Sequence, residues 1–242
     1  MYNNCLILLT CCINPGNMIM TALTDVNERR KQYYQAFDYY LEYTNCPIVI
    51  VENTGFVIDE KYLNHPRIEY LTFSGNDYPK DKGKGFGEIL IIEYALKNSK
   101  FIQLNPESSI IKITGRLKIL SISKHLKQIK NCTQKNSVLA DIEMNFQLAY
   151  SYFFVANKFF FENYFFFFKD KINDTDGFYF EHALAKAIQN YISESNNFYQ
   201  ILCPINFLGL SGTTGKYYTV DKSFRKSAKM KIKYLYFKFK QM

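Results

Sequence analysis

The sequence predicts an α/β fold with a mostly parallel sheet that is flanked by helices and followed by a basic helical tail. Two observations carry this prediction. Apolar runs without the alternation of a half-exposed strand recur at 5–13, 47–51, 68–73 and 110–114, as is typical of strands buried on both faces. Helical patterns separate several of these runs, and alternating strands and helices favour parallel pairing with right-handed crossovers.

The first strand and the helix after it are the clearest of these elements. The run at 5–13 is followed by Asn14-Pro15-Gly16, and Thr24-Asp25 then begins a helix that we expect to end near Tyr43. The residues that we place on its apolar face are Val26, Tyr33, Phe37, Tyr40 and Leu41. Those that we place on its solvent face are Arg29, Arg30 and Lys31.

The later elements are defined by the turn sequences between them. The second and third strands end in Glu52-Asn53-Thr54-Gly55 and in Ser74-Gly75-Asn76-Asp77. The segment 82–88 leads into a helix that runs to about Lys97, and a short strand is expected at 101–104. Beyond residue 116 we expect a strand within 137–144, mixed strand and helix signals at 153–168, a helix over 177–192 and a basic tail over 222–240.

Length and charge indicate one large domain with a separate tail. We expect a domain over 1–220 and a basic, aromatic tail over 221–242. Eight Lys and Arg residues against one acid lie in the tail, which holds +7 of the net charge of +8 and leaves about +1 for the first 220 residues. A nearly neutral domain argues against a nucleic-acid partner. The tail suits an anionic membrane surface, with RNA or a partner protein as alternatives.

The six cysteines show no metal-ligand spacing, and no signal-peptide pattern precedes them. We therefore expect reduced thiols and a cytoplasmic protein. The most apolar stretch, 153–168, contains Lys158 and Glu162 and is shorter than the ~20 residues that a membrane-spanning helix needs.

The strand at 110–114 leads into Gly115 and Arg116 and is the most informative stretch of the chain. Glycine lets the backbone approach a ligand closely, and a guanidinium offers paired donors to a carboxylate or a phosphate. Ligands of α/β folds bind at the carboxyl ends of the strands. Arg116 is therefore a candidate ligand for a small anion, or else it caps the strand or pairs with a surface acid.

Two further segments are candidates for contact with a ligand. Glu52 and Asn53 could accept hydrogen bonds from a base or a ribose, or could form an Asx-type turn with Gly55. The three glycines and two lysines of 82–88 could cradle phosphate at a helix N-terminus, or could be a flexible loop. Their spacing matches neither a Walker A motif nor a dinucleotide fingerprint.

The remaining candidate site residues are three acids and one loop in the second half of the chain. Asp174 and Asp176 could hold a divalent cation, or Asp176 could cap the helix that follows. Glu181, near the start of that helix, could act as a general base or simply be a helix-start acid. The small, hydroxyl-rich segment 209–216 suits a lid over phosphates or a plain surface loop.

The order of these motifs resembles the nucleotide-binding half of a GT-A glycosyltransferase, a Rossmann-like fold, over residues 5–215. The segments that resemble those of small bacterial enzymes from capsule and O-antigen (lipopolysaccharide) loci are VIVENTG (49–55), KGKGFGE (82–88), IIKITGR (110–116), FYFEHALAKAI (178–188) and GLSGTTG (209–215). The resemblance implies transfer of a sugar, by default a hexose, from a nucleotide-sugar donor, by default a UDP-sugar. The acceptor would be a surface polysaccharide or a lipid-linked glycan.

The resemblance also implies roles for single residues. Cys11 to Asn14 and Glu52 would line the nucleotide site, with Asn53 beside them, and Lys84 and Gly85 would approach the nucleotide or its diphosphate. Glu181 matches the acid that deprotonates the acceptor hydroxyl in inverting members. The remaining donor-side positions would be Lys112, Thr114, Gly115 and, in the loop over the donor, Ser211.

The chain departs from the family at the expected metal site. GT-A enzymes usually carry Asp-x-Asp after the fourth strand, where it binds a cation that neutralises the leaving diphosphate. The corresponding residues here run from Lys112 to Arg116 and include no acid. Either Arg116 and Lys112 supply the positive charge directly, or Asp141, Asp174 or Asp176 holds Mn²⁺ or Mg²⁺ elsewhere.

The sequence therefore favours a cytoplasmic glycosyltransferase, peripheral on the inner face of the cell membrane. A sugar nucleotidyltransferase is one alternative, but the segment 11–16 lacks the cations of the N-terminal signature of that class. A non-catalytic adaptor that binds a membrane or RNA through its tail is the other.

Overall fold

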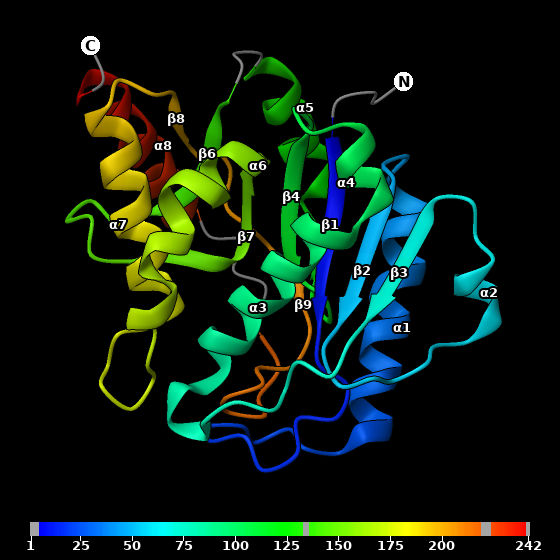
Figure 1. Ribbon diagram of the computed structural model, residues 1–242. Helices are drawn as coiled ribbons and strands as arrows, with labels where there is room; N and C mark the ends of the chain where they lie inside the picture. Colours follow the sequence, from blue (N-terminus) through cyan, green and yellow to red (C-terminus); the bar gives the residue numbers. More distant parts are fainter. Residues whose placement is uncertain (1–4, 133–135, 219–223, 241–242) are drawn as a thin grey trace.

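A seven-stranded sheet forms the centre of the computed structural model, which describes residues 5–132, 136–218 and 224–240 (Figure 1). The strand order is β3-β2-β1-β4-β7-β6-β8, and β7 runs antiparallel to both of its neighbours. The other pairings described in this sheet are parallel. The predicted α/β fold with a mostly parallel, helix-flanked sheet is therefore confirmed.

The strands of the sheet are β1 (Cys5–Cys11), β2 (Ile48–Glu52), β3 (Ile68–Thr72), β4 (Ser109–Thr114), β6 (Val138–Ile142), β7 (Ala149–Ala156) and β8 (Phe198–Gln200). A separate antiparallel ribbon pairs β5 (Lys118–Ile119) with β9 (Phe207–Leu208). The helices are α1 (Val26–Tyr43), α2 (Glu60–Leu63), α3 (Gly83–Asn98), α4 (Lys100–Leu104), α5 (Ile122–Asn131), α6 (Lys158–Phe160), α7 (Phe180–Ser193) and α8 (Phe224–Lys240). A 3₁₀ turn at 80–82 precedes α3, and irregular helical turns at 161–171 follow α6.

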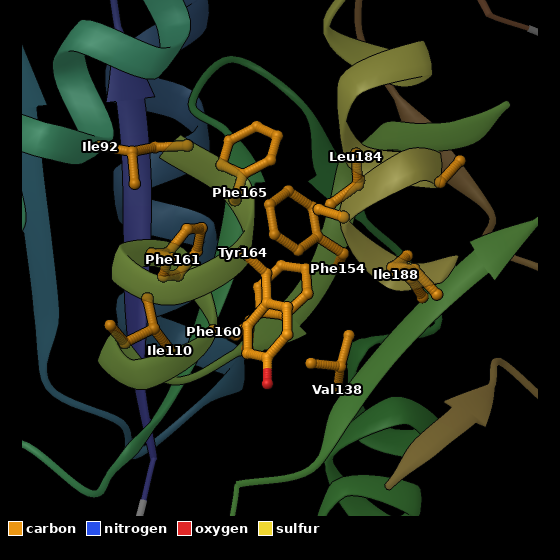
Figure 2. Packing of buried hydrophobic residues seen from close by; sticks show 14 of the residues in the cluster. Ile92, Ile110, Val138, Phe154, Phe160, Phe161, Tyr164, Phe165, Leu184 and Ile188 are labelled. Carbon is orange, nitrogen blue, oxygen red and sulfur yellow. The ribbon is translucent and has the colours of Figure 1, made fainter. Parts of the chain in front are cut away.

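Two apolar clusters lie on opposite faces of the sheet. Helices α1 and α5 belong to one cluster, and α3 and α7 belong to the other. Figure 2 shows the second cluster, in which Phe160, Phe161 and Phe165 from the segment after β7 pack near Phe154 and Leu184. Successive residues of β1 alternate between the two clusters. This double burial explains why the strand reads as one continuous apolar run.

The short strand expected at 101–104 is wrong, because these residues form helix α4. The Ser99 side chain accepts a hydrogen bond from the N–H of Ile102 at 3.2 Å. Glu69 of β3 accepts bonds from the N–H groups of Lys100 and Phe101 at 2.6 and 3.0 Å. A carboxylate from a distant strand thus satisfies N–H groups that the isolated segment would leave unpaired.

Residues 224–240 of the basic tail form α8, which packs beside β8 at one edge of the sheet (Figure 1). Met230, Lys233 and Phe237 are buried there, whereas Ile232 and Leu235 are 60% and 50% exposed. In the described parts of the chain, no helix is both long enough and apolar enough to cross a bilayer.

Strand β1 lies where the order of the sheet reverses, with β2 and β3 on one side and β4 on the other. The connections that leave the carboxyl ends of β1 and β4 diverge at such a point and open a crevice between them. The residues after Cys11 and after Thr114 are therefore brought together at this edge.

Candidate functional site

A cavity of about 200 Å³ lies at the carboxyl ends of β1 and β4. The ends of these strands contribute Thr10, Cys11, Cys12, Thr114 and Arg116 to its lining. Other lining residues, from α1, α3 and the segments after β2, β3 and β9, include Arg29, Tyr33, Asn53, Asn76, Tyr78, Lys84, Glu88, Gly212 and Thr213. The cavity therefore occupies the point of the sheet at which α/β folds bind ligands.

Arg116 lines the cavity, as the sequence predicts for an anion ligand. Its Nη1 donates to the carbonyl of Leu210 at 2.5 Å, and a Cβ on Gly212 would lie 2.5 Å from its Nη2. Glycine at position 212 therefore lets the 209–215 loop lie against the guanidinium. Among the described residues, no carboxylate forms an ion pair with Arg116. Its remaining donors suit an anionic ligand.

The expectation that Arg29 lies on the solvent face of α1 is wrong, since this residue is 5% exposed and lines the cavity. Its Nε donates to the carbonyl of Cys12 at 2.9 Å, and its Nη1 donates to the carbonyl of Leu23 at 3.0 Å. These carbonyls orient the guanidinium without neutralising its charge. The sequence held a signal for this position, because Arg29 precedes the buried Tyr33 by four residues and so shares its helix face.

Lys84 is the third cation of the cavity. Its Nζ donates to Thr213 Oγ1 at 2.7 Å and to a backbone carbonyl at 2.6 Å. Burial lowers the pKa of Lys84, Asp174 opposes this shift, and the guanidinium groups of Arg116 and Arg29 lower the pKa further. Both guanidinium groups therefore lie close enough to repel the ammonium group of Lys84, and a bound anion would relieve that repulsion.

Two amide side chains line the cavity after β2 and β3. Asn53 is 1% exposed, and its buried Oδ1 has no hydrogen-bond partner among the residues that the structure describes. The Oδ1 of Asn76 is buried as well and, in the described part of the chain, has no partner. Buried polar atoms in native proteins are nearly always hydrogen-bonded, so these acceptors indicate a ligand that supplies the donors. A ribose hydroxyl or the N–H of a base has the required chemistry.

Glu52 lies beside this site but does not line the cavity. It is fully buried, and its carboxylate accepts hydrogen bonds from the N–H groups of Ile13, Thr54 and Phe56 at 3.0, 2.8 and 3.0 Å. These bonds join the segment after β1 to the turn after β2. The side chain therefore holds the backbone around Asn53 and has its own acceptors occupied within the protein.

The glycine-rich segment 82–88 lies largely within the first turns of α3 rather than in a loop before it. Asp174 occupies the N-terminus of this helix, where its Oδ2 accepts a hydrogen bond from the N–H of Lys84 at 2.9 Å. A Cβ on Gly83 would lie 2.0 Å from the same oxygen. Burial raises the pKa of Asp174, and the N–H bond from Lys84 opposes the shift. The helix N-terminus expected to cradle phosphate thus already holds a carboxylate.

Gly85 and Gly115 allow neighbouring elements of the fold to pack closely. A Cβ on Gly85 would lie 3.1 Å from the backbone nitrogen of Phe180, between α3 and α7. A Cβ on Gly115 would lie 2.7 Å from Cys11 Sγ, where β1 and β4 end together. Both glycines therefore bring neighbouring elements together beside the cavity without lining it.

Lys112, which is buried, and Glu88, which is partly exposed, form an ion pair at the wall of the cavity. Lys112 is fully buried on β4, and its Nζ lies 2.5 Å from Glu88 Oε1. Thr10 Oγ1 donates to the same oxygen at 2.9 Å. Glu88 lines the cavity and Lys112 does not. The positive charge of Lys112 is therefore directed at Glu88 rather than at a ligand.

Glu181 lies near the start of α7, partly buried and outside the cavity lining. Ser151 Oγ donates a hydrogen bond to Glu181 Oε1. Burial raises the pKa of Glu181, and this hydrogen bond opposes the shift. Ser151 also accepts a bond from Lys112 Nζ through its carbonyl at 2.5 Å. Ser151 thus links the Glu88–Lys112 pair to Glu181.

The 209–215 loop covers part of the cavity through Gly212 and Thr213. The carbonyl of Gly212 accepts a hydrogen bond from the N–H of Ala22 at 2.9 Å, which ties the loop to the segment after β1. Ser211 itself is buried, and its Oγ accepts a bond from the N–H of Thr214 at 3.2 Å. Its hydroxyl supports the loop and does not line the cavity.

The acids considered for a metal ion have other partners or lie apart from the cavity lining. Asp141 pairs with Lys233 and accepts a hydrogen bond from Gln200 Nε2 at 2.8 Å. Asp176 is exposed and does not cap α7, whose N-cap is Tyr179. Within the described ranges, no group of three or more His, Cys, Asp or Glu side chains could hold a metal ion. The donor set does not fit a divalent cation, because three cations line the cavity and its carboxylate is paired with Lys112.

Asn14 is exposed outside the cavity, where its Oδ1 accepts a hydrogen bond from the N–H of Gly16 at 3.1 Å. The cavity lining includes six of the residues that the sequence placed at the site: Cys11, Cys12, Asn53, Lys84, Thr114 and Arg116. The main residues that the motifs did not reveal are Arg29, Tyr33, Asn76 and Tyr78.

No known family model matches the sequence, and no curated protein matches it. Among solved structures, the chain is similar to a protein of Desulfovibrio desulfuricans G20 that is provisionally named a nucleotide-diphospho-sugar transferase. The two chains share 9% sequence identity, the similarity covers 81% of this chain and 79% of that one, and the TM-score is 0.46. A likeness this distant says nothing of what this chain binds.

Proposed function

We propose that this protein is a glycosyltransferase that binds a nucleotide-sugar donor, by default a UDP-hexose, in the cavity at the ends of β1 and β4. The observation that carries the proposal is the set of three cavity cations, Arg29, Lys84 and Arg116, without a carboxylate ion-pair partner among the described residues. Asn53 and Asn76, each with a buried amide oxygen that has no partner within the described ranges, line the same cavity. Cations suit a diphosphate, and the amides suit a nucleoside. The GT-A-like motif order of the sequence supports the same reading.

The charges of the cavity give a direct way to stabilise the leaving group. Negative charge builds up on the nucleoside diphosphate as its bond to the sugar breaks, and pre-placed donors stabilise such charge most. Arg116 and Lys84 would contact the diphosphate, and Arg29 would add positive potential. The protein's own cations would therefore do what a metal ion does in many transferases.

Thermal unfolding with nucleotides tests this proposal. UDP, GDP, CDP and dTDP are added separately, each with and without Mn²⁺. We expect one of them to raise the melting temperature by several degrees at 100 times its Kd, with no requirement for Mn²⁺. Absence of a shift with all four would contradict the nucleotide site, and a shift that needs Mn²⁺ would contradict the role of the cations.

We further propose that the acceptor is a surface polysaccharide or lipid-linked glycan and that α8 touches an anionic membrane at the inner face of the cell membrane. Ile232 and Leu235 are exposed on this helix, and Lys229 and Lys231 are exposed beside them. Apolar side chains among lysines suit an anionic lipid surface. In a flotation assay, we expect the protein to float with phosphatidylglycerol vesicles. The double variant Ile232→Ser, Leu235→Ser should lose most of this binding. Equal binding to uncharged phosphatidylcholine vesicles would contradict the proposed attraction between the lysines of α8 and an anionic lipid surface.

A further inference from the structure

Glu88 is the one carboxylate among the described residues that line the cavity. Its Oε1 is held by two groups, Lys112 Nζ at 2.5 Å and Thr10 Oγ1 at 2.9 Å. Within the described part of the chain, no group hydrogen-bonds to its Oε2. One oxygen of this carboxylate is therefore fixed by the protein, and the other remains available to a ligand.

Lys112 is bound on all sides by the protein. Its Nζ donates to the carbonyl of Ser151 at 2.5 Å and lies over the rings of Phe154 and Phe180, 5.8 and 5.4 Å from their centroids. A buried ammonium group requires a counter-charge in contact with it, and Glu88 supplies that charge. Lys112 therefore acts on the orientation of Glu88 and not on a ligand.

Glu181 is one step further from the cavity than Glu88. Ser151 bridges it to Lys112, because the Ser151 hydroxyl donates to Glu181 and the Ser151 carbonyl accepts from Lys112, and Glu181 is absent from the cavity lining. A group that removes a proton must come within hydrogen-bond distance of the hydroxyl that carries it. Glu88 meets this geometric condition for a substrate in the cavity more directly than Glu181 does.

We propose that Glu88 is the catalytic carboxylate of this site and that Lys112 and Thr10 are its positioning residues. The inference rests on the proposed function. The attacking hydroxyl oxygen forms a bond to the anomeric carbon while the bond from that carbon to the diphosphate oxygen breaks. The electron pair of the broken bond goes to the nucleoside diphosphate, and the hydroxyl proton goes to Glu88 Oε2.

The charge of Glu88 provides a readout that a merely structural role would not produce. A carboxylate beside a bound diphosphate repels it, so Glu88 weakens nucleotide binding even though it compensates the charge of Lys112. In Glu88→Gln the repulsion disappears and the charge of Lys112 is no longer compensated. The variant should therefore bind the nucleoside diphosphate more tightly, by roughly 3- to 30-fold, while it loses turnover.

The experiment compares the wild type with Glu88→Gln, Glu181→Gln and Glu93→Gln. Glu93 lies on the same helix, is paired with Lys97 and Lys169, and is outside the cavity lining, so it serves as the matched control. Calorimetry measures the Kd of the nucleotide that stabilises the wild type, and a coupled assay measures its release from the corresponding nucleotide sugars. We expect only Glu88→Gln to combine tighter binding with release that is slower by roughly 100-fold or more.

The outcomes separate this inference from the function on which it rests. If no nucleotide binds to the wild type, the proposed function fails. If nucleotide binds, weaker or unchanged affinity in Glu88→Gln overturns the inference, as does turnover that is lost in Glu181→Gln and kept in Glu88→Gln. A wild type that binds nucleotide but releases none from any of the nucleotide sugars offered also overturns the inference. Thr10→Val should lower kcat with little change in Kd, as a positioning residue would.

Discussion

The cavity and the edge of the sheet near α8 both bury cations, but they compensate the charge differently. At the edge, Lys233 is 5% exposed and pairs with Asp141. In the cavity, Arg29 is also 5% exposed, yet its guanidinium group donates hydrogen bonds to backbone carbonyls. A buried charge without a counter-ion costs several kcal/mol. A paired cation therefore indicates a structural role, whereas an unpaired one at a cavity indicates a ligand that brings the missing charge.

The largest effect is expected from Lys233→Met, which leaves Asp141 buried without its counter-charge. We expect the free energy of unfolding to fall by about 3–5 kcal/mol, with nucleotide affinity unchanged. Urea denaturation and calorimetry measure the two quantities. Lys231→Met, at an exposed position of the same helix, is the control and should be nearly neutral. A loss of affinity in Lys233→Met without a loss of stability would break the comparison.

His125 shows what a buried group does when it can give up its charge. It is fully buried, its Nε2 lies 2.8 Å from Ser121 Oγ, and burial lowers its pKa from 6.5 to about 4. The unfolded chain therefore binds more protons than the folded one between pH 6.5 and 4, so stability is complete above this window and falls as the pH drops through it. The guanidinium group of an arginine stays protonated throughout this pH range, so burial cannot remove its charge.

The corresponding prediction is a loss of about 3 kcal/mol of unfolding free energy between neutral pH and pH 4 that is attributable to His125. Urea denaturation at stepwise pH measures it in the wild type and in His125→Gln. The variant should show a shallower acid dependence, whatever its stability at neutral pH. If the unfolding free energy of both proteins depends on pH in the same way, burial does not lower the pKa of His125 in the folded protein.

Arg116→Gln tests the ligand side of the comparison. We expect nucleotide affinity to fall by roughly 10- to 100-fold, because one charge-assisted contact to the diphosphate is lost, while stability changes little. The matched control is Arg67→Gln. Arg67 also donates to backbone carbonyls, those of Thr44 and Leu41, but lies outside the cavity lining. Equal affinity losses in both variants would show that the effect does not come from the cavity.

The smallest effect is expected from Asp174→Ala, which removes the carboxylate at the N-terminus of α3. Loss of this cap should cost about 1 kcal/mol of unfolding free energy, with nucleotide affinity within a factor of about three. Chemical denaturation measures the free energy of unfolding, and calorimetry measures the nucleotide affinity. If affinity rises tenfold or more instead, the helix N-terminus is a phosphate site that Asp174 occupies in the free protein.

The order of strands and helices in the first half could be predicted because burial on both faces leaves continuous apolar runs. The carboxyl ends of β1 and β4 were likewise predictable. Arg116 lines the cavity at its place after β4, and its role as an anion ligand stays a prediction. The strand predicted at 101–104 failed because Glu69 caps α4 from another element. Local sequence does not record such a contact.

The sequence by itself determined the layers of the fold and the edge of the sheet at which a ligand would bind, because hydrophobic periodicity and strand order are properties of the chain alone. Only the tertiary structure decided which charged groups face the cavity. Arg29 faces it instead of solvent, Lys112 is committed to Glu88, and Asp174 occupies a helix N-terminus. The physical reason is that a buried charge is stabilised by whatever lies within a few ångströms, and those neighbours come from distant parts of the sequence.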